Sequence, residues 1–160
     1  MRTLVRLDRL NVIAAIGVMT VVGCGGGSTG PKLPDPVKVK GVVAMDSQPL
    51  PDAMVFFVPE GGKSMGNGAT GITDSSGTFE LVTTSGKAKK PGAIPGNYKV
   101  WISRLVGPDG KPVAPNADVP PADLGAVESL PSRYSDVMMT ELKASVTGEG
   151  GSFDFSISSR

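Results

Sequence analysis

The stretch AMVFFV at residues 53–58 decides the fold class, because it is the most strongly β-prone run in the chain and the turn sequence PEGG at residues 59–62 stops it. β-Branched and aromatic side chains fit a pleated strand, and successive side chains of a strand point to opposite faces. Val55 and Phe57 are therefore expected to point into a core. By the same argument, the outward side chains are Met54, Phe56 and Val58.

Six more short runs alternate in a similar way, and Gly and Pro residues separate them. They cover residues 37–43, 69–73, 78–82, 96–103, 141–147 and 152–157. The last two are expected to pair through the turn at residues 148–151. A helical turn is expected only within residues 121–130. Seven short strands without an amphipathic helix predict an all-β fold, an antiparallel β-sandwich.

The alternation also predicts which side chains form the core between two sheets. In the run at residues 96–103, one face is apolar, which leaves Trp101 on the other face with Lys99 and Ser103. The side chains expected to be mainly buried are Val55, Phe57, Phe79, Leu81, Tyr98, Val100, Ile102, Phe153 and Phe155.

The N-terminus has the order of parts found in a secretory signal. Three arginines within residues 1–9 precede an apolar stretch at residues 10–22, which is shorter than the about 20 apolar residues of a membrane-spanning helix. The stretch ends in VVGC at residues 21–24, which resembles the lipobox of bacterial lipoproteins. That resemblance implies a diacylglyceryl group on the Cys24 thiol and cleavage between Gly23 and Cys24. The alternative is an ordinary signal, or an uncleaved anchor, followed by an unrelated cysteine.

The lipobox divides the chain into three parts. Residues 1–23 are the cleaved signal peptide, residues 24–36 are a tether rich in Gly, Ser and Pro, and residues 37–160 are one domain. The expected location is extracytoplasmic, with the chain anchored in a membrane by its lipid. Gly25 follows the cysteine where an inner-membrane retention signal would place aspartate, which favours the outer membrane. Cys24 is the only cysteine, so no disulfide is expected within the domain.

The charge balance of the remaining chain is close to neutral. Of the 16 basic and 15 acidic residues, three arginines and one aspartate lie in the signal peptide, so 13 and 14 remain. A nucleic-acid-binding protein would show a basic patch, and this sequence offers little support for one. The lysine-rich segment at residues 87–90 lies between glycine and a Pro-Gly pair, so it is expected to be a solvated loop.

Four segments carry a resemblance to a known family. They are VKGVV at residues 39–43, QPLPDAMVFFVP at residues 48–59, TGITDSSGTF at residues 70–79 and PGNYKV at residues 95–100. Together they resemble the carboxypeptidase regulatory-like domain, and the chain from Leu130 onward is similar to a group of bacterial lipoproteins that carry this domain alone. Ser47 and Asp52 stand where glycine is common in that family.

This resemblance implies a transthyretin-like (prealbumin-like) sandwich of seven strands, with the Greek-key connections of an immunoglobulin-like fold. It also implies that the strands at residues 53–58 and 96–103 are neighbours in one sheet. Domains of the family usually accompany catalytic or surface domains and are not themselves enzymes.

Asp74 allows two interpretations. Its carboxylate can accept backbone N–H bonds in a tight turn in which Gly77 has a positive φ. As a calcium ligand it would have two serines beside it and no nearby glutamate. These residues supply few of the about 6–8 oxygen ligands that a calcium ion takes. The turn interpretation is therefore favoured.

The sequence offers little catalytic chemistry. It contains no histidine, which excludes a Ser-His-Asp triad, a Cys-His dyad and any imidazole–metal site. The remaining candidates are two carboxylate pairs and two serines without an evident activating partner: Asp118 with Asp123, Glu128 with Asp136, Ser64 and Ser132. We therefore expect that the protein is not an enzyme and uses no cofactor or metal.

Two functions stay open. The domain is a structural or protein-interaction module of the cell envelope, or a carbohydrate- or small-ligand-binding sandwich with exposed aromatic side chains. The candidate binding face is the outward trio Met54, Phe56 and Trp101. The Pro-rich segment at residues 107–132 either leaves this face open or folds over it, and its length favours the covering arrangement. Expected partners are the membrane, through diacylglyceryl on Cys24, and an envelope protein or glycan, but no nucleic acid.

Overall fold

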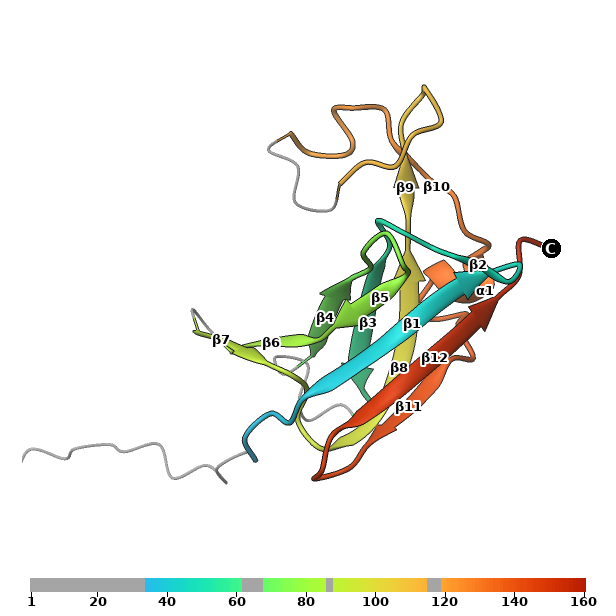
Figure 1. Ribbon diagram of the computed structural model, residues 1–160. Coiled ribbons are helices and arrows are strands. Elements are labelled where there is room, and N and C mark those ends of the chain that lie inside the picture. Colours follow the sequence, from blue (N-terminus) through green and yellow to red (C-terminus); the bar gives the residue numbers. More distant parts are fainter. Residues whose placement is uncertain (1–33, 62–67, 86–87, 115–118) are drawn as a thin grey trace, which may run out of the picture. The chain divides into compact units, whose positions relative to one another are not determined.

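The computed structural model describes residues 34–61, 68–85, 88–114 and 119–160 (Figure 1). The predicted signal peptide, the predicted lipobox and residues 24–33 of the predicted tether lie outside the described residues. The chain from Leu33 to Arg160 forms one compact unit. No helix in the described part is long and apolar enough to cross a membrane.

The described part of the chain consists mainly of β-strands and loops, with one short helix, which confirms the all-β prediction. Its elements are β1 (Val39–Met45), β2 (Gln48–Pro49), β3 (Met54–Pro59), β4 (Ala69–Ile72), β5 (Thr78–Glu80), β6 (Val82–Ser85), β7 (Ala88–Pro91), β8 (Gly96–Ser103), β9 (Leu105–Val106), β10 (Val127–Glu128), α1 (Ser132–Ser135), β11 (Lys143–Val146) and β12 (Gly151–Ile157). Each of the seven predicted runs overlaps one of these strands, and the run at residues 78–82 overlaps two, β5 and β6.

The strands form two larger sheets and a two-stranded ribbon (Figure 1). The six-stranded sheet has the order β11-β8-β3-β4-β6-β7. The four-stranded sheet has the order β12-β1-β2, and β5 also pairs with β1, while β9 and β10 form the ribbon. β1 and β12 run parallel, from Val39 opposite Gly151 to Met45 opposite Ile157. This pair departs from the predicted antiparallel arrangement, whereas the other paired strands in the described part are antiparallel.

The core lies between the two larger sheets and is centred on Phe57. The Phe57 ring lies 5.6 Å from the ring of Tyr98 in its own sheet, and 6.4 Å and 6.1 Å from Phe79 and Phe155 of the four-stranded sheet, centroid to centroid. Eight of the nine side chains predicted to be buried are buried. The exception is Phe153, which is half-buried and packs against the core near the start of β12.

Gly41 allows β1 to pass close to this core. A Cβ atom at Gly41 would lie 2.0 Å from the carbonyl oxygen of Phe153 and 2.6 Å from the ring of Phe79. Because glycine leaves that space open, the Phe79 ring can extend across β1 and stack with Phe155, with centroids 6.2 Å apart. Gly41 therefore lies at an inward position of β1 where a side chain would collide with Phe153 and Phe79.

The predicted strand at residues 78–82 is in fact divided at Leu81. β5 pairs with β1 in the four-stranded sheet, and β6 pairs with β4 in the six-stranded sheet. The Leu81 side chain is buried, its N–H donates to the Val39 carbonyl at 3.0 Å, and its carbonyl accepts from the Gly92 N–H at 2.6 Å. Leu81 therefore connects the two sheets. The hydrophobic pattern of residues 78–82 continues through Leu81, so the pattern does not reveal this junction.

Two further predictions are corrected, and a third is confirmed. The described part of the lysine-rich segment is a strand, β7, although its side chains are exposed as expected; lysines alone do not distinguish an exposed edge strand from a loop. The strands β11 and β12 do not pair, because the turn after Thr147 carries the chain from one large sheet to the other. Residues 121–125 form the expected helical turn, in which the Leu124 N–H donates to the Pro121 carbonyl at 3.2 Å and the Gly125 N–H donates to the Ala122 carbonyl at 3.1 Å. The strand β10 and the helix α1 follow it.

Candidate binding face

The outer face of the six-stranded sheet brings the predicted trio together. β3 and β8 pair antiparallel, with Phe56 opposite Trp101, Met54 opposite Ser103 and Val58 opposite Lys99. The alternation of buried and half-buried residues is strict along the central part of both strands. Val55 and Phe57 therefore point inward while Met54, Phe56 and Trp101 lie on the outside, in the arrangement that the sequence predicted.

Phe56 and Trp101 form a face-to-face aromatic pair. Their ring centroids lie 3.8 Å apart and their planes differ by 3°. Since the two residues come from neighbouring strands, each ring covers one face of the other and both are half-buried. The indole N–H of Trp101 has no hydrogen-bond partner among the described residues. Every fully buried side-chain nitrogen or oxygen there has a partner, so this N–H is not fully buried.

The apolar surface continues from this pair across β4 and β6. Thr70 lies opposite both Phe56 and Val82, and Ile72 lies opposite Met54 with 44% of its surface exposed. A hollow of about 280 Å³ lies over this part of the sheet, between Met54, Ile72, Val82 and the β7 residue Lys89. Ile72 and Val82 were not predicted to belong to this face, because alternation within residues 69–73 does not tell which side of the strand is the outer one.

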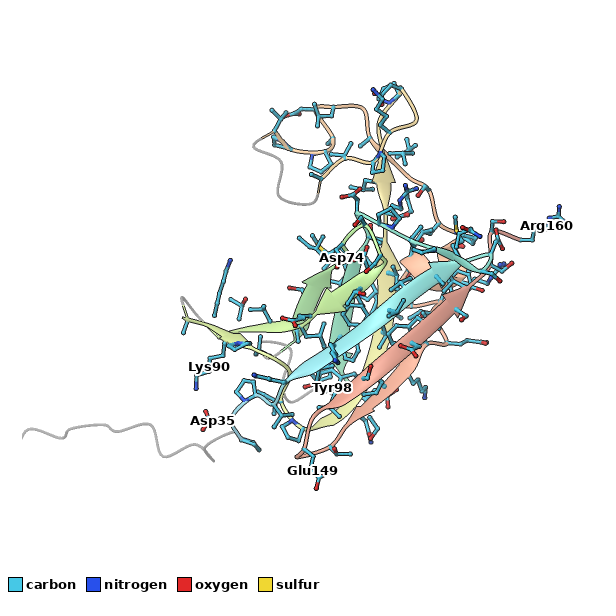
Figure 2. All side chains as sticks on the ribbon, viewed as in Figure 1. Asp35, Asp74, Lys90, Tyr98, Glu149 and Arg160 are labelled. Carbon is cyan, nitrogen blue, oxygen red and sulfur yellow. The ribbon has the colours of Figure 1, made fainter. Side chains whose placement is uncertain are left out.

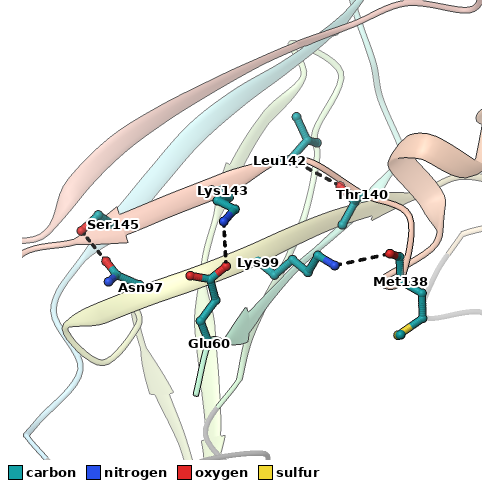
Figure 3. A network of polar contacts seen from close by, with 8 residues as sticks. All are labelled: Glu60, Asn97, Lys99, Met138, Thr140, Leu142, Lys143 and Ser145. Atoms are coloured by element: carbon teal, nitrogen blue, oxygen red, sulfur yellow. Dashed lines mark hydrogen bonds and ion pairs between the residues drawn. The ribbon is translucent and has the colours of Figure 1, made fainter. Parts of the chain in front are cut away.

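Polar side chains fix the opposite flank of the face, where β11 lies beside β8 (Figure 3). The Lys143 ammonium group lies 3.3 Å from a Glu60 carboxylate oxygen, which connects β11 to the end of β3. The Lys99 Nζ donates to the Met138 carbonyl at 3.5 Å. The Ser145 hydroxyl donates to the Asn97 side-chain oxygen at 2.9 Å. These contacts give the aromatic pair a charged and hydrogen-bonded border.

The Pro-rich segment lies against one end of the face. At its base, the Glu128 carboxylate accepts hydrogen bonds from the Ser103 hydroxyl (2.7 Å), the Arg104 N–H (3.1 Å) and the Leu130 N–H (2.9 Å). A hollow of about 160 Å³ lies where Leu105, Val113 and Pro121 approach Met54 and Phe56, and Trp101 does not line it. Among the described residues, Val113 and Pro121 of this segment therefore lie beside the Met54 end of the face.

Asp74 occupies the turn that the sequence predicted (Figure 2). One carboxylate oxygen accepts hydrogen bonds from the Ser76 N–H (2.8 Å), the Ser76 hydroxyl (2.6 Å) and the Thr78 N–H (3.0 Å), and Gly77 has φ +74°. These bonds, led by the one from the Ser76 side chain, lower the pKa of the Asp74 carboxyl below its usual value. The residue therefore serves the turn.

The remaining sequence candidates do not form a reactive site in the described part of the chain. Asp118 and Ser64 lie outside the described residues. The Asp136 carboxylate accepts the Met138 N–H at 2.7 Å and so serves a local turn, as Glu128 serves the base of the Pro-rich segment. Ser132 begins α1. Across the described ranges, no three His, Cys, Asp or Glu side chains are grouped so that they could hold a metal ion.

Comparison with known proteins assigns the chain to no family. No protein-family model matches it, and no curated protein matches it. A crystal structure of a 9R-lipoxygenase from Cyanothece PCC8801 is similar over 77% of this chain, with 14% sequence identity and a TM-score of 0.34. The chain spans 16% of the length of that lipoxygenase chain. A likeness of this size carries no argument about fold or function.

Proposed function

We propose that the protein is a non-catalytic lipoprotein of the bacterial cell envelope whose β-domain is a protein-interaction module. The observation that carries this proposal is the Phe56–Trp101 pair, which places two large aromatic side chains outside the core, on a face flanked by polar contacts. Surface patches that combine exposed apolar groups with a polar rim are typical of interaction sites. Aromatic residues are also enriched at such sites.

The proposed anchor is lipid on Cys24, supported by the lipobox resemblance at residues 21–24. Several buried acyl chains would hold the protein firmly, since each buried methylene contributes about 0.8 kcal/mol. The described chain starts at the end of the tether, where the Asp35 carboxylate lies 2.8 Å from the Lys90 ammonium group of β7 (Figure 2). We favour the outer membrane because Gly25 stands in place of a retention signal.

We further propose that the domain is a variant of the transthyretin-like, seven-stranded Greek-key sandwich. Three observations support this proposal: two larger sheets enclose one core, β3 and β8 are neighbours, and the chain crosses between the sheets after β11. The short strands β2, β7, β9 and β10 would then be additions to that framework, and β5 and β6 would be the two halves of one divided strand, which leaves seven.

The geometry of the aromatic pair favours a protein partner over a glycan. A sugar ring packs against the open face of an aromatic ring, and here each ring already has one face covered by the other. What remains of the pair is one face and the edges of each ring and the indole N–H, which suit apolar side chains and backbone carbonyl groups of a protein. A glycan array with the same domain tests the carbohydrate alternative directly.

Metabolic labelling with a fatty-acid analogue tests the anchor. We expect Cys24→Ala to abolish the label and to leave uncleaved precursor, because the lipid is attached through the thiol. Ser28→Ala in the tether is the matched control and should keep both label and processing. Unchanged labelling of the Cys24→Ala protein would contradict the anchor.

Site-specific photo-crosslinking in envelope membranes tests the face. A photoreactive residue at Thr70, which is exposed beside Phe56, should form an adduct with a protein partner, and Trp101→Ser in the same chain should abolish it. The control position is Val42, which is exposed on the outer face of the other sheet. Equal adducts from both positions, or an adduct that survives Trp101→Ser, would contradict the proposal.

A further inference from the structure

The edges of the two larger sheets differ in how they are protected. The edge strand β7 carries Lys89, Lys90 and Pro91, and the edge strand β11 is four residues long with Lys143 exposed. On its second edge, the four-stranded sheet has only the short strands β2 and β5. Lysines, prolines and short strands are the usual means by which proteins keep sheet edges from pairing with other chains.

The remaining edge strand, β12, lacks these features. It is seven residues long, contains no Lys, Arg or Pro, and is the last strand of its sheet (Figure 1). Its exposed side chains are Ser152, Asp154 and Ser156, and its inward side chains are Phe153, Phe155 and Ile157. Phe153 is half-buried, so the hydrophobic core reaches the surface at this edge.

The hydrogen bonds of β12 show which of its backbone groups are free. The Gly151 N–H donates to the Lys38 carbonyl, and the Ile157 carbonyl accepts from the Asp46 N–H. In a parallel pair, alternate residues turn both backbone groups toward the partner strand. Residues 151, 153, 155 and 157 therefore face β1. The N–H and C=O groups of Ser152, Asp154 and Ser156 point to the open side, where no described residue bonds them.

Neighbouring residues close both ends of this open segment. At one end, the Ser158 N–H lies 3.4 Å from the Tyr134 hydroxyl, and the Ser158 carbonyl accepts from Arg133 at 3.0 Å. At the other end, the Gly150 N–H donates to the Thr147 carbonyl and the Gly150 carbonyl accepts from the Thr147 hydroxyl. The open edge thus runs from residue 152 to residue 156.

A second copy of the chain does not fit this edge. Antiparallel pairing of two copies about a two-fold axis can use the whole segment only if Asp154 lies opposite Asp154, which sets like charges against each other. Shifting the register by two residues in one direction places Ser152 opposite Ser158, whose backbone is already engaged. Shifting it in the other direction places Ser156 opposite Gly150, which is engaged in its turn.

We propose that the open edge of β12, residues 152–156, binds an extended segment of a partner protein that places a lysine or arginine opposite Asp154. The segment adds a strand to the four-stranded sheet through the free backbone groups of Ser152, Asp154 and Ser156. Its basic side chain pairs with the exposed Asp154 carboxylate. Apolar side chains on either side of the basic residue cover the exposed part of Phe153 and lie beside Phe155. This edge is separate from the aromatic face, so each site can fail without the other.

An NMR titration of the ¹⁵N-labelled unit from Leu33 to Arg160, which is compact and contains the whole core described above, tests the proposal. The probe is the peptide acetyl-Thr-Ser-Val-Lys-Val-Ser-Thr-amide, and the matched peptide has Glu in place of Lys. We expect the amide signals of residues 152, 154 and 156 to shift. We expect the Lys peptide to bind at least about threefold more tightly than the Glu peptide, as expected for one cross-strand charge pair.

Charge reversal provides the decisive comparison. Asp154→Lys should reverse the preference between the two peptides, whereas Glu80→Lys, an exposed charge reversal on β5 of the same sheet, should leave it unchanged. Equal binding of both peptides, shifts confined to β3 and β8, or no shift at residues 152–156 would overturn the proposal. Self-association of the unmodified unit through residues 152–156, detected by sedimentation and by the same amide signals, would also overturn it.

Discussion

Phe56 and Phe57 are adjacent in the sequence and have the same side chain, and yet they belong to different parts of the molecule. Phe57 is 1% exposed and contacts four other aromatic rings between the sheets. Phe56 is half-buried and stacks on Trp101 alone. The difference shows that the side of the strand, not the residue type, decides whether an aromatic residue stabilises the fold or forms a surface.

The largest difference between the two faces should appear in stability. Phe57→Ala should lower the free energy of unfolding by about 3–5 kcal/mol, because it leaves a cavity among four rings. Phe56→Ala should cost about 1 kcal/mol, mostly the loss of one aromatic pair. Chemical denaturation of both variants measures this. If the two losses were equal, the inner and outer faces of β3 would be wrongly assigned.

A second test adds volume to the inner face in place of removing it. Gly41→Ala should lower the free energy of unfolding by about 1–3 kcal/mol, since a Cβ there collides with a backbone carbonyl and the Phe79 ring. Gly148→Ala is the control, because nothing lies within 4 Å of a Cβ at that position. A Gly41→Ala protein as stable as the control would mean that β1 does not approach the core as closely as described.

The inner face could be predicted from the sequence because its signal is local. Alternation within residues 53–58 and 96–103 assigns Phe57 and Tyr98 to the core without knowledge of the partner strands. The break at Leu81 and the parallel pairing of β12 with β1 depend on contacts between segments far apart in the chain. The local pattern is the same with or without them, so it could not reveal either feature.

The outer face could be predicted only in part. To predict that Phe56 and Trp101 lie side by side, one must know that their two strands are neighbours. The resemblance to the carboxypeptidase regulatory-like domain implied this order, and β3 and β8 do pair in the structure. The border formed by Glu60 and Lys143 joins elements that are more than eighty residues apart in the numbering. Such a contact has no signature in either segment, because each charge by itself is typical of a solvated surface.

A third test changes a residue that belongs to neither face. Asp46 and Ser47 form the two-residue turn between β1 and β2, with φ +49° and +67°, so Ser47 is in the left-handed region that favours glycine. Ser47→Gly should raise the free energy of unfolding by about 0.5–1 kcal/mol by removing this strain. Thr84→Gly, at an exposed position of β6, should lower it by about as much. Thermal unfolding compares the two, and destabilisation by Ser47→Gly would contradict the assigned turn.

The smallest effect should be optical, and it tests the outer face alone. Trp101 is the only tryptophan, so its fluorescence reports directly on the aromatic pair. Because Phe56 covers one face of the indole and Trp101 is half-buried, quenching by acrylamide should be intermediate between that of a buried and a free tryptophan. Phe56→Ala should shift the emission to the red and increase quenching, with little change in stability. Val42→Ala, on the outer face of the other sheet, should change neither signal. If the indole were fully shielded in the unmodified protein, the Pro-rich segment would cover the whole face, and Trp101 could not take part in binding until that segment moved.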